Sequence, residues 1–187
     1  MKHFLPLILA LSALPVHAQS LDGEDRASNW RVVHSERFGL WESMCDEREE
    51  PAGLHQRCYI RHVDVFSPAP QFGAIFTFVH YDDKALTVEF GIEPGTLFGP
   101  NGFRIERGAD MTWRTHSPGC LTGVSCTFTG QDAGELVEAM AEGGAFRLGF
   151  RDRHGKTQDL TWPLEGFAEA HADLMRNSGA RGLLPSG

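Results

Sequence analysis

Short segments in which apolar and polar residues alternate, separated by turns rich in glycine and proline, run through most of this 187-residue chain. In the clearest of them, residues 58–66, Tyr59, Arg61, Val63 and Val65 point to one side of the segment and Ile60, His62 and Asp64 to the other. This two-residue period is that of a β-strand. Segments of this kind recur about every 8–12 residues, which predicts antiparallel strands rather than alternating strands and helices.

Two pairs of neighbouring segments predict β-hairpins. Residues 72–80 and 85–92 flank a polar turn at 81–84, and residues 145–151 and 156–162 flank a turn at 152–155. Further short strands are expected at 29–34, 103–106, 111–115 and 124–128. Turns are expected at 93–95 and 99–102, where proline and glycine gather.

Two helices are predicted near the C-terminus. Asp132 is a candidate N-cap with Glu135 three residues later, and an apolar stripe follows until Gly143. A second helix is expected from about 164 to 177. The predicted fold class is therefore mainly β: an antiparallel β-sandwich or partly open barrel with two short C-terminal helices.

The N-terminus has the order of a secretory signal peptide, with a basic start, an apolar run and a small-residue cleavage site ending at Ala18. We expect residues 1–18 to be removed, 19–28 to form a flexible acidic leader, 29–177 to form a single domain and 178–187 to form a loose tail. No later stretch is long and apolar enough to span a bilayer. The expected location is the periplasm, or outside the cell.

Export changes how the four cysteines are interpreted, because disulfides persist in oxidising compartments. Cys45, Cys58, Cys120 and Cys126 allow three pairings. We predict Cys45–Cys58 and Cys120–Cys126, since each closes a short polar loop, with stabilisation of roughly 3 and about 2.5 kcal/mol. The spacing fits neither a structural zinc site nor a redox-active Cys-x-x-Cys pair.

Charge and motifs exclude several functions. The net charge of −8 opposes binding to nucleic acid or anionic lipid. The chain has no zinc-protease His pair, calcium loop, serine elbow or phosphate-binding glycine loop. We therefore predict no catalytic residues, no metal ligands and no cofactor.

Three alternatives stay open at this stage. An enzyme would need distant residues such as His80, Asp82 and His116 to converge. A metal-binding protein would use the seven histidines outside the signal peptide, together with carboxylates. The four tryptophans would line a carbohydrate groove if exposed, although core packing is expected. The acidic run 46–50 is expected to be a solvated loop closed by a disulfide.

Several segments resemble the invasion-associated locus B (IalB) family of exported bacterial proteins. They are the early Trp30–Val32 strand, the Pro/Gly-rich stretch 92–105, the second cysteine couple at 120–126, the 136–140 helix, the 146–150 strand and Leu164–Phe167 at the last helix. The chain departs from the family pattern at its first cysteine, because Cys45 follows Trp30 by fifteen residues, with Trp41 four residues before it.

This resemblance implies an exported β-rich protein, linked in some members to host-cell invasion, with no established catalytic residues to carry over. Together with the motif analysis, it predicts a non-enzymatic binding or accessory module of the bacterial envelope. Its partner is expected to be a protein or a surface, and neither nucleic acid nor the membrane interior.

Overall fold

The computed structural model describes residues 29–68, 70–122 and 126–185. The signal peptide and leader expected at 1–28 lie outside these residues. Within the described residues, ten strands form two antiparallel sheets, which confirms the predicted mainly β fold. The six-stranded sheet has the order β1 (Arg31–Phe38), β2 (Trp41–Glu50), β3 (Gly53–Ser67), β4 (Gly73–Asp82), β5 (Ala85–Gly91) and β8 (Thr127–Thr129). The four-stranded sheet has the order β10 (Thr157–Pro163), β9 (Ala145–Arg151), β6 (Leu97–Arg107) and β7 (Asp110–Arg114).

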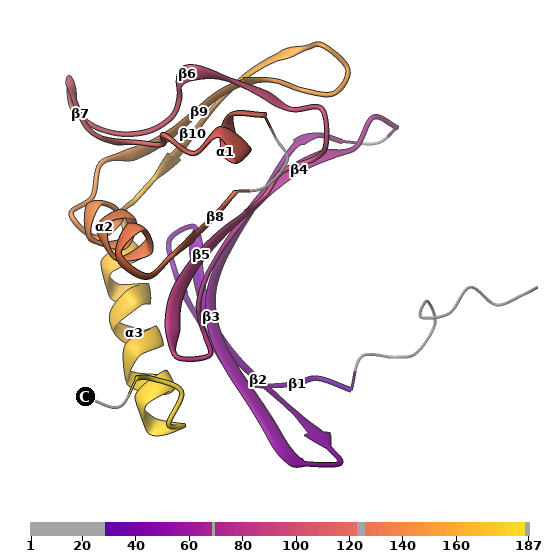
Figure 1. Cartoon of the computed structure of the whole chain (residues 1–187), viewed down its shortest axis with the longest axis vertical. Coiled ribbons are helices and arrows are strands. Elements are labelled where there is room, and N and C mark those ends of the chain that lie inside the picture. The colour runs from indigo at the N-terminus through magenta and orange to yellow at the C-terminus, as the bar shows by residue number, and fades with distance from the viewer. Residues whose placement is uncertain (1–28, 69, 123–125, 186–187) are drawn as a thin grey trace, which may run out of the picture.

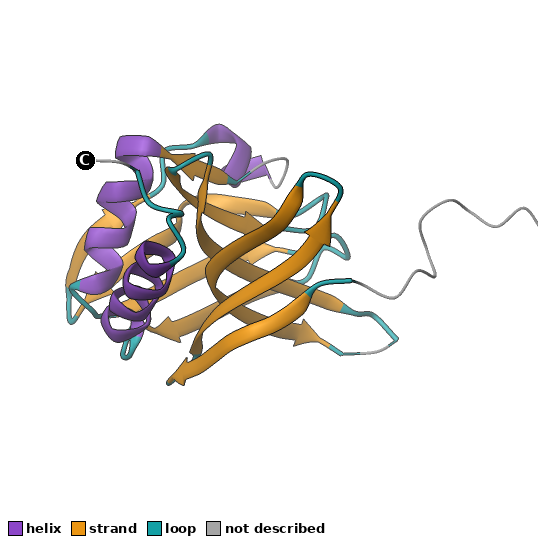
Figure 2. Cartoon of the chain, turned by 90° about the horizontal axis from the view of Figure 1, so that it is seen from below, coloured by secondary structure: helices purple, strands orange, loops and turns teal. Residues whose placement is uncertain are grey.

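The six-stranded sheet curves into a half-barrel, and the helices and the four-stranded sheet all lie on one side of it (Figures 1 and 2). Helix α3 (Phe167–Ala180) packs against β1, β2 and β3, while α2 (Gly130–Ala141) packs against β5 and β8. The short helix α1 (Pro118–Thr122) contacts β6. We call the side of this sheet that carries the helices its inner face, and the opposite side its outer face.

Aromatic rings join the two sheets in one core. Phe90 of β5 meets Phe103 of β6 edge-on, with ring centroids 4.6 Å apart, and also packs on Phe146 of β9. Trp162 Nε1 of β10 donates a hydrogen bond to Asp64 Oδ2 of β3 over 2.7 Å. This bond ties the sheets together and satisfies a polar atom that burial would otherwise penalise.

Both predicted hairpins are confirmed. Strands β4 and β5 pair from Asp82 and Ala85 onward, so the connection is two residues, Asp83 and Lys84, both with positive φ. Two consecutive left-handed residues match the twist of the flanking strands. Strands β9 and β10 pair in the second hairpin, where the buried Asp152 carboxylate accepts backbone hydrogen bonds from residues 154 and 156 of the turn.

The acidic run 46–50 corrects the sequence prediction, because it is part of strand β2 and not a loop. Its carboxylates are held by neighbouring strands: Asp46 accepts from Arg57 and Tyr59, and Glu47 accepts from Gln56 at 3.1 Å. Strands β2 and β3 form a long hairpin in which Cys45 and Cys58 are directly opposed. The structure joins Cys45 to Cys58 and Cys120 to Cys126, as the sequence predicted.

Three further differences concern element boundaries. Residues 99–102, expected to be a turn, lie inside β6, where the pairing with β9 shifts between Phe98 and Phe103. Helix α2 begins at Gly130 with Thr129 as its N-cap, so Asp132 lies in the first turn instead of capping the helix. Helix α3 continues to Ala180, and Ser178 is buried, so the expected loose tail is helical over its first three residues.

Candidate functional site

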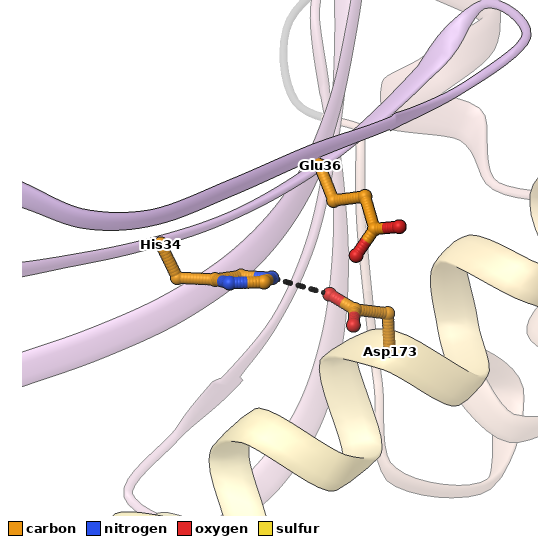
Figure 3. Close-up of side chains that lie close together, drawn as sticks. All are labelled: His34, Glu36 and Asp173. Carbon is orange, nitrogen blue, oxygen red and sulfur yellow. Dashed lines mark hydrogen bonds and ion pairs between the residues drawn. The ribbon is translucent and has the colours of Figure 1, made fainter.

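A cluster of charged side chains lies where the edge strand β1 meets helix α3. His34 and Glu36 are two residues apart on β1, so both point to the inner face, toward the helix. Asp173 projects from α3 between them (Figure 3). We call these three residues the His34 cluster. One potential ligand atom from each of them lies within 4.8 Å of the others.

The central bond of the cluster joins His34 Nε2 to Asp173 Oδ2 over 2.7 Å. Asp173 is only 1% exposed, whereas Glu36 is exposed to solvent. The Arg176 guanidinium binds the other carboxylate oxygen, Oδ1, from one turn further along α3. Asn177 Nδ2 donates to the Asp173 carbonyl and lies 3.2 Å from His34 Nε2. Both Asp173 carboxylate oxygens are thus in contact with donors.

Opposing effects set the ionisation of Asp173. Burial alone raises the pKa of this carboxyl, but the hydrogen bond from His34, the nearby Ser43 hydroxyl and the charges of His34 and Arg176 together lower it below its ordinary value. The carboxylate is therefore ionised at neutral pH. Because it lies 2.7 Å from Nε2, the imidazole proton sits between the two atoms and the ring acts as donor.

The cluster combines one imidazole and two carboxylates, which is a donor set for a divalent cation or the core of a structural ion pair. The sequence analysis did not identify it. His34 and Asp173 are 139 residues apart, and the first strand was expected to end at residue 34, before Glu36. The two-residue spacing of His34 and Glu36 is the one local signal that points to it.

The histidines and carboxylates expected of a hypothetical enzyme occupy separate places. His80 lies on the outer face of β4, 3.5 Å from Glu89 of β5. His116 follows β7 and lines a different pocket, beside Trp113 and the carboxylates of α2. Asp82 ends β4 at the hairpin turn. The described structure does not gather these three residues in one pocket.

Two half-buried histidines on the inner side were not singled out from the sequence. The His62 ring lies between Trp41 and Trp162, with ring centroids 5.5 and 4.6 Å away. His171 stacks on Phe167 within α3. Burial lowers the pKa of both His62 and His171, because the charged imidazolium is disfavoured away from water. Within the described residues, Nε2 of each ring is buried without a hydrogen-bond partner.

The outer face of the six-stranded sheet carries exposed apolar side chains. We call Tyr59, Val63, Val65, Phe76 and Phe78 the outer apolar surface. Val63, Val65 and Phe76 are 50%, 48% and 39% exposed, and no described element covers this side of β3 and β4 (Figure 1). Phe78 meets the rings of Tyr59 and Phe76 edge-on, with centroids 5.8 and 5.5 Å away, so the aromatic side chains form one continuous strip.

Charged pairs border this strip. Arg57 binds Asp46 over 3.1 Å and stacks on the Trp30 ring at 3.9 Å from its centroid. Arg61 binds Glu42 over 2.9 Å. Arg57, Arg61, His80 and Glu89 line a pocket of about 340 Å³ whose apolar wall is Tyr59 and Phe78. The surface thus has an apolar centre and a polar rim of both signs.

The tryptophans do not form a shared groove. Trp41 and Trp162 are buried in the core, as expected, and Trp113 is partly buried against Phe103 and Phe128. Trp30 is instead held near the outer face by Arg57 and Arg48, whose guanidinium lies 4.4 Å from the ring centroid. Its position adds aromatic area next to the rim of the outer apolar surface.

Comparison with known proteins gives a similarity of structure and none of sequence. No family model matches the sequence, and no curated protein matches it. Among solved structures, the chain is similar to the crystal structure of invasion associated protein B from Bartonella henselae. The similarity covers 79% of this chain and 98% of that one, with 15% sequence identity and a TM-score of 0.46. That protein bears the name of the family which the sequence segments resemble.

Proposed function

We propose that this protein is an exported, non-enzymatic binding or accessory module of the bacterial envelope, which binds a protein partner through its outer apolar surface. The observation that carries the proposal is the exposure of Val63, Val65 and Phe76, beside the partly exposed rings of Tyr59 and Phe78, on the side of the sheet opposite the core. Contiguous exposed apolar patches rimmed by polar groups are typical of interaction sites in soluble proteins.

The chemistry of the surface favours a protein partner. Binding sites for proteins combine an apolar, often aromatic centre with a polar rim, and arginine and tyrosine are enriched there. The Arg57–Asp46 and Arg61–Glu42 pairs place both charge signs beside the strip, so a partner with polar groups of both signs is complementary. A polyanion gains little, because these arginines are already neutralised and the chain is acidic overall.

Location outside the cytoplasm is supported by the two disulfides, which reducing compartments do not maintain. The signal-peptide pattern at residues 1–18 supports export. No helix in the described part of the chain has the length and apolar character that crossing a bilayer requires. The resemblance to the invasion-associated family adds interaction with a host cell as the biological context of this proposal.

Site-specific photocrosslinking in the native envelope tests the binding surface. A benzophenone side chain is placed at Val63 or Phe76 on the outer apolar surface. The matched controls are Leu97 and Met111, which are equally exposed apolar positions on the four-stranded sheet. We expect the same adduct from both outer positions and none from the controls.

Equal crosslinking from all four positions, or adducts from the control positions alone, would contradict the proposed surface. An adduct with the mass of two chains would replace the envelope partner by a second copy of this protein. The non-enzymatic part has a separate test: turnover of esters, peptides or glycans by the purified protein, abolished by substituting His80 or His116, would show it to be wrong.

A further inference from the structure

We propose that the His34 cluster is a binding site for a divalent first-row transition cation of the Zn²⁺ type. The site is separate from the outer apolar surface, because it lies on the inner side of the sheet, between β1 and α3 (Figure 3). The ligands are His34 Nε2, Asp173 Oδ2 and one Glu36 carboxylate oxygen.

The donor set selects the class of cation. Imidazole nitrogen suits Zn²⁺, Cu²⁺ and Ni²⁺, whereas Mg²⁺ and Ca²⁺ prefer oxygen alone. Two carboxylates and one neutral imidazole carry a charge of −2, which balances the divalent ion. Three protein ligands with a water in the fourth position is a common arrangement for zinc sites that stay open to solvent.

The distances require small movements of flexible groups. Bonds of about 2.0–2.1 Å in a tetrahedron place ligand atoms roughly 3.3 Å apart. The His34–Asp173 separation of 2.7 Å must therefore widen slightly, and the Glu36 oxygen, at most 4.8 Å away, must approach. Glu36 is exposed and free to change rotamer. When the ion binds, the Nε2 proton leaves to solvent and the ion takes its place between the two atoms.

Groups around the cluster already hold the ligands in position. Arg176 binds Asp173 Oδ1 and leaves Oδ2 for the ion, an arrangement in which an outer donor orients a ligating carboxylate. Ser43 faces the same carboxylate from β2, directly opposite Glu36 in the strand pairing. The Ser43 hydroxyl is fully buried and makes no hydrogen bond of normal geometry with a described residue. A water bound to the ion would give this hydroxyl a partner.

The test is titration of the tag-free, disulfide-bonded protein with Zn²⁺ by calorimetry, with Mg²⁺ as the comparison ion. We expect one Zn²⁺ per chain and no saturable Mg²⁺ binding. Glu36→Gln tests the site with little risk to folding, because Glu36 is exposed, and we expect at least about tenfold weaker binding. His34→Asn removes the nitrogen ligand and should weaken binding more.

The matched control is His55→Asn. His55 Nδ1 lies 3.2 Å from Glu50 Oε1 in an exposed His–carboxylate pair near the β2–β3 turn, and no described residue completes a three-ligand group there. This variant should bind Zn²⁺ as the unaltered protein does. Electron paramagnetic resonance of bound Cu²⁺ gives a second readout: coupling to one nitrogen is expected in the unaltered protein and in His55→Asn, and none in His34→Asn.

Three results would each overturn the site: no stoichiometric Zn²⁺ binding below about 100 μM; affinity unchanged in both Glu36→Gln and His34→Asn; or loss of binding in His55→Asn. If His34→Asn fails to fold, as judged by circular dichroism, Glu36→Gln alone decides the question.

Discussion

The two faces of the six-stranded sheet are built from the same strands but differ in what they show to their surroundings. On the inner face, Ile60, Ile75 and Val79 are buried in the hydrophobic core. On the outer face, Val63 and Phe76 face solvent. Alternation along a strand separates the two faces, but the elements packed against the sheet decide which face becomes the core.

Strand β3 makes this difference plainest. Its polar His62 and Asp64 point inward, whereas Val63 and Val65 point outward. Each inward polar group has a hydrogen-bond partner: Trp162 donates to Asp64, and His62 Nδ1 lies 3.1 Å from the Leu40 carbonyl oxygen. Burial of a polar group costs free energy unless hydrogen bonds replace those made to water. The inner face of β3 is therefore specified by particular contacts and not by hydrophobicity alone.

Neighbouring substitutions on β4 test the difference most strongly. Ile75→Ala removes buried methyl groups and should lower the free energy of unfolding by about 2–5 kcal/mol. Phe76→Ala, one residue later on the opposite face, should cost less than about 1 kcal/mol despite removing more atoms. Urea unfolding followed by circular dichroism measures both. Equal losses would mean that the outer face is covered in the folded protein.

The two disulfides allow a second comparison, of the stability that each contributes. Removing Cys45–Cys58 with two alanines opens a 13-residue separation on the inner face, at a cost of roughly 3 kcal/mol. Removing Cys120–Cys126, with a separation of six residues, should cost about 2.5 kcal/mol. Urea unfolding of the two double variants compares them directly. A larger loss for the Cys120 and Cys126 variant would show that the link between α1 and the start of β8 is the more important constraint.

A pH titration tests His171, the half-buried histidine of α3 on the inner face. Burial lowers the pKa of His171 in the folded protein. Just below pH 6.5, His171 therefore binds a proton in the unfolded chain but not in the folded protein. Stability therefore falls as the pH drops from 6.5 toward the folded pKa. His171→Leu should reduce the loss of stability between pH 7.5 and 5. The part of the loss that comes from His62, whose pKa is also lowered by burial, should remain. Thermal unfolding across this range measures the slope, and an unchanged slope would contradict the assignment.

The last test adds a single methyl group to the outer face. Gly91 of β5 is paired with Phe76, whose ring covers it so closely that an added methyl group would overlap the ring. In Gly91→Ala the ring must rotate away, which its exposure allows, so the cost should be about 1 kcal/mol. The variant should nonetheless weaken crosslinking from position 63, because the displaced Phe76 ring interrupts the apolar strip. Crosslinking at full yield would show that the ring position is not required.

The sequence predicted the elements whose local signals agree. The β4–β5 and β9–β10 hairpins combine alternation with polar turn residues, and both were predicted nearly to their ends. Strand β2 was missed because its Asp and Glu residues are uncommon in strands, and only cross-strand arginines make them suitable there. The sequence analysis placed a turn inside strand β6, because Gly99 and Gly102 are typical turn residues. At Gly102 a side chain would collide with the backbone of Gly149, so close approach of β9 explains that glycine.

The sites were harder to predict than the fold. The disulfide pairs are close in sequence and could be chosen from it. The His34 cluster forms only when α3 packs against β1. No local sequence pattern predicts a contact between residues 34 and 173. The side on which Val63 and Val65 lie was predicted, but their exposure was not, because alternation is the same whichever face is covered.

The two disulfides join the first cysteine to the second and the third to the fourth in chain order. A chain that enters an oxidising compartment N-terminus first presents its cysteines in this same order. An oxidant that joins each newly exposed thiol to the preceding free one thus makes only native bonds. We expect oxidative folding of this protein to proceed without disulfide reshuffling, so that an enzyme that introduces disulfides would suffice and an isomerase would be dispensable.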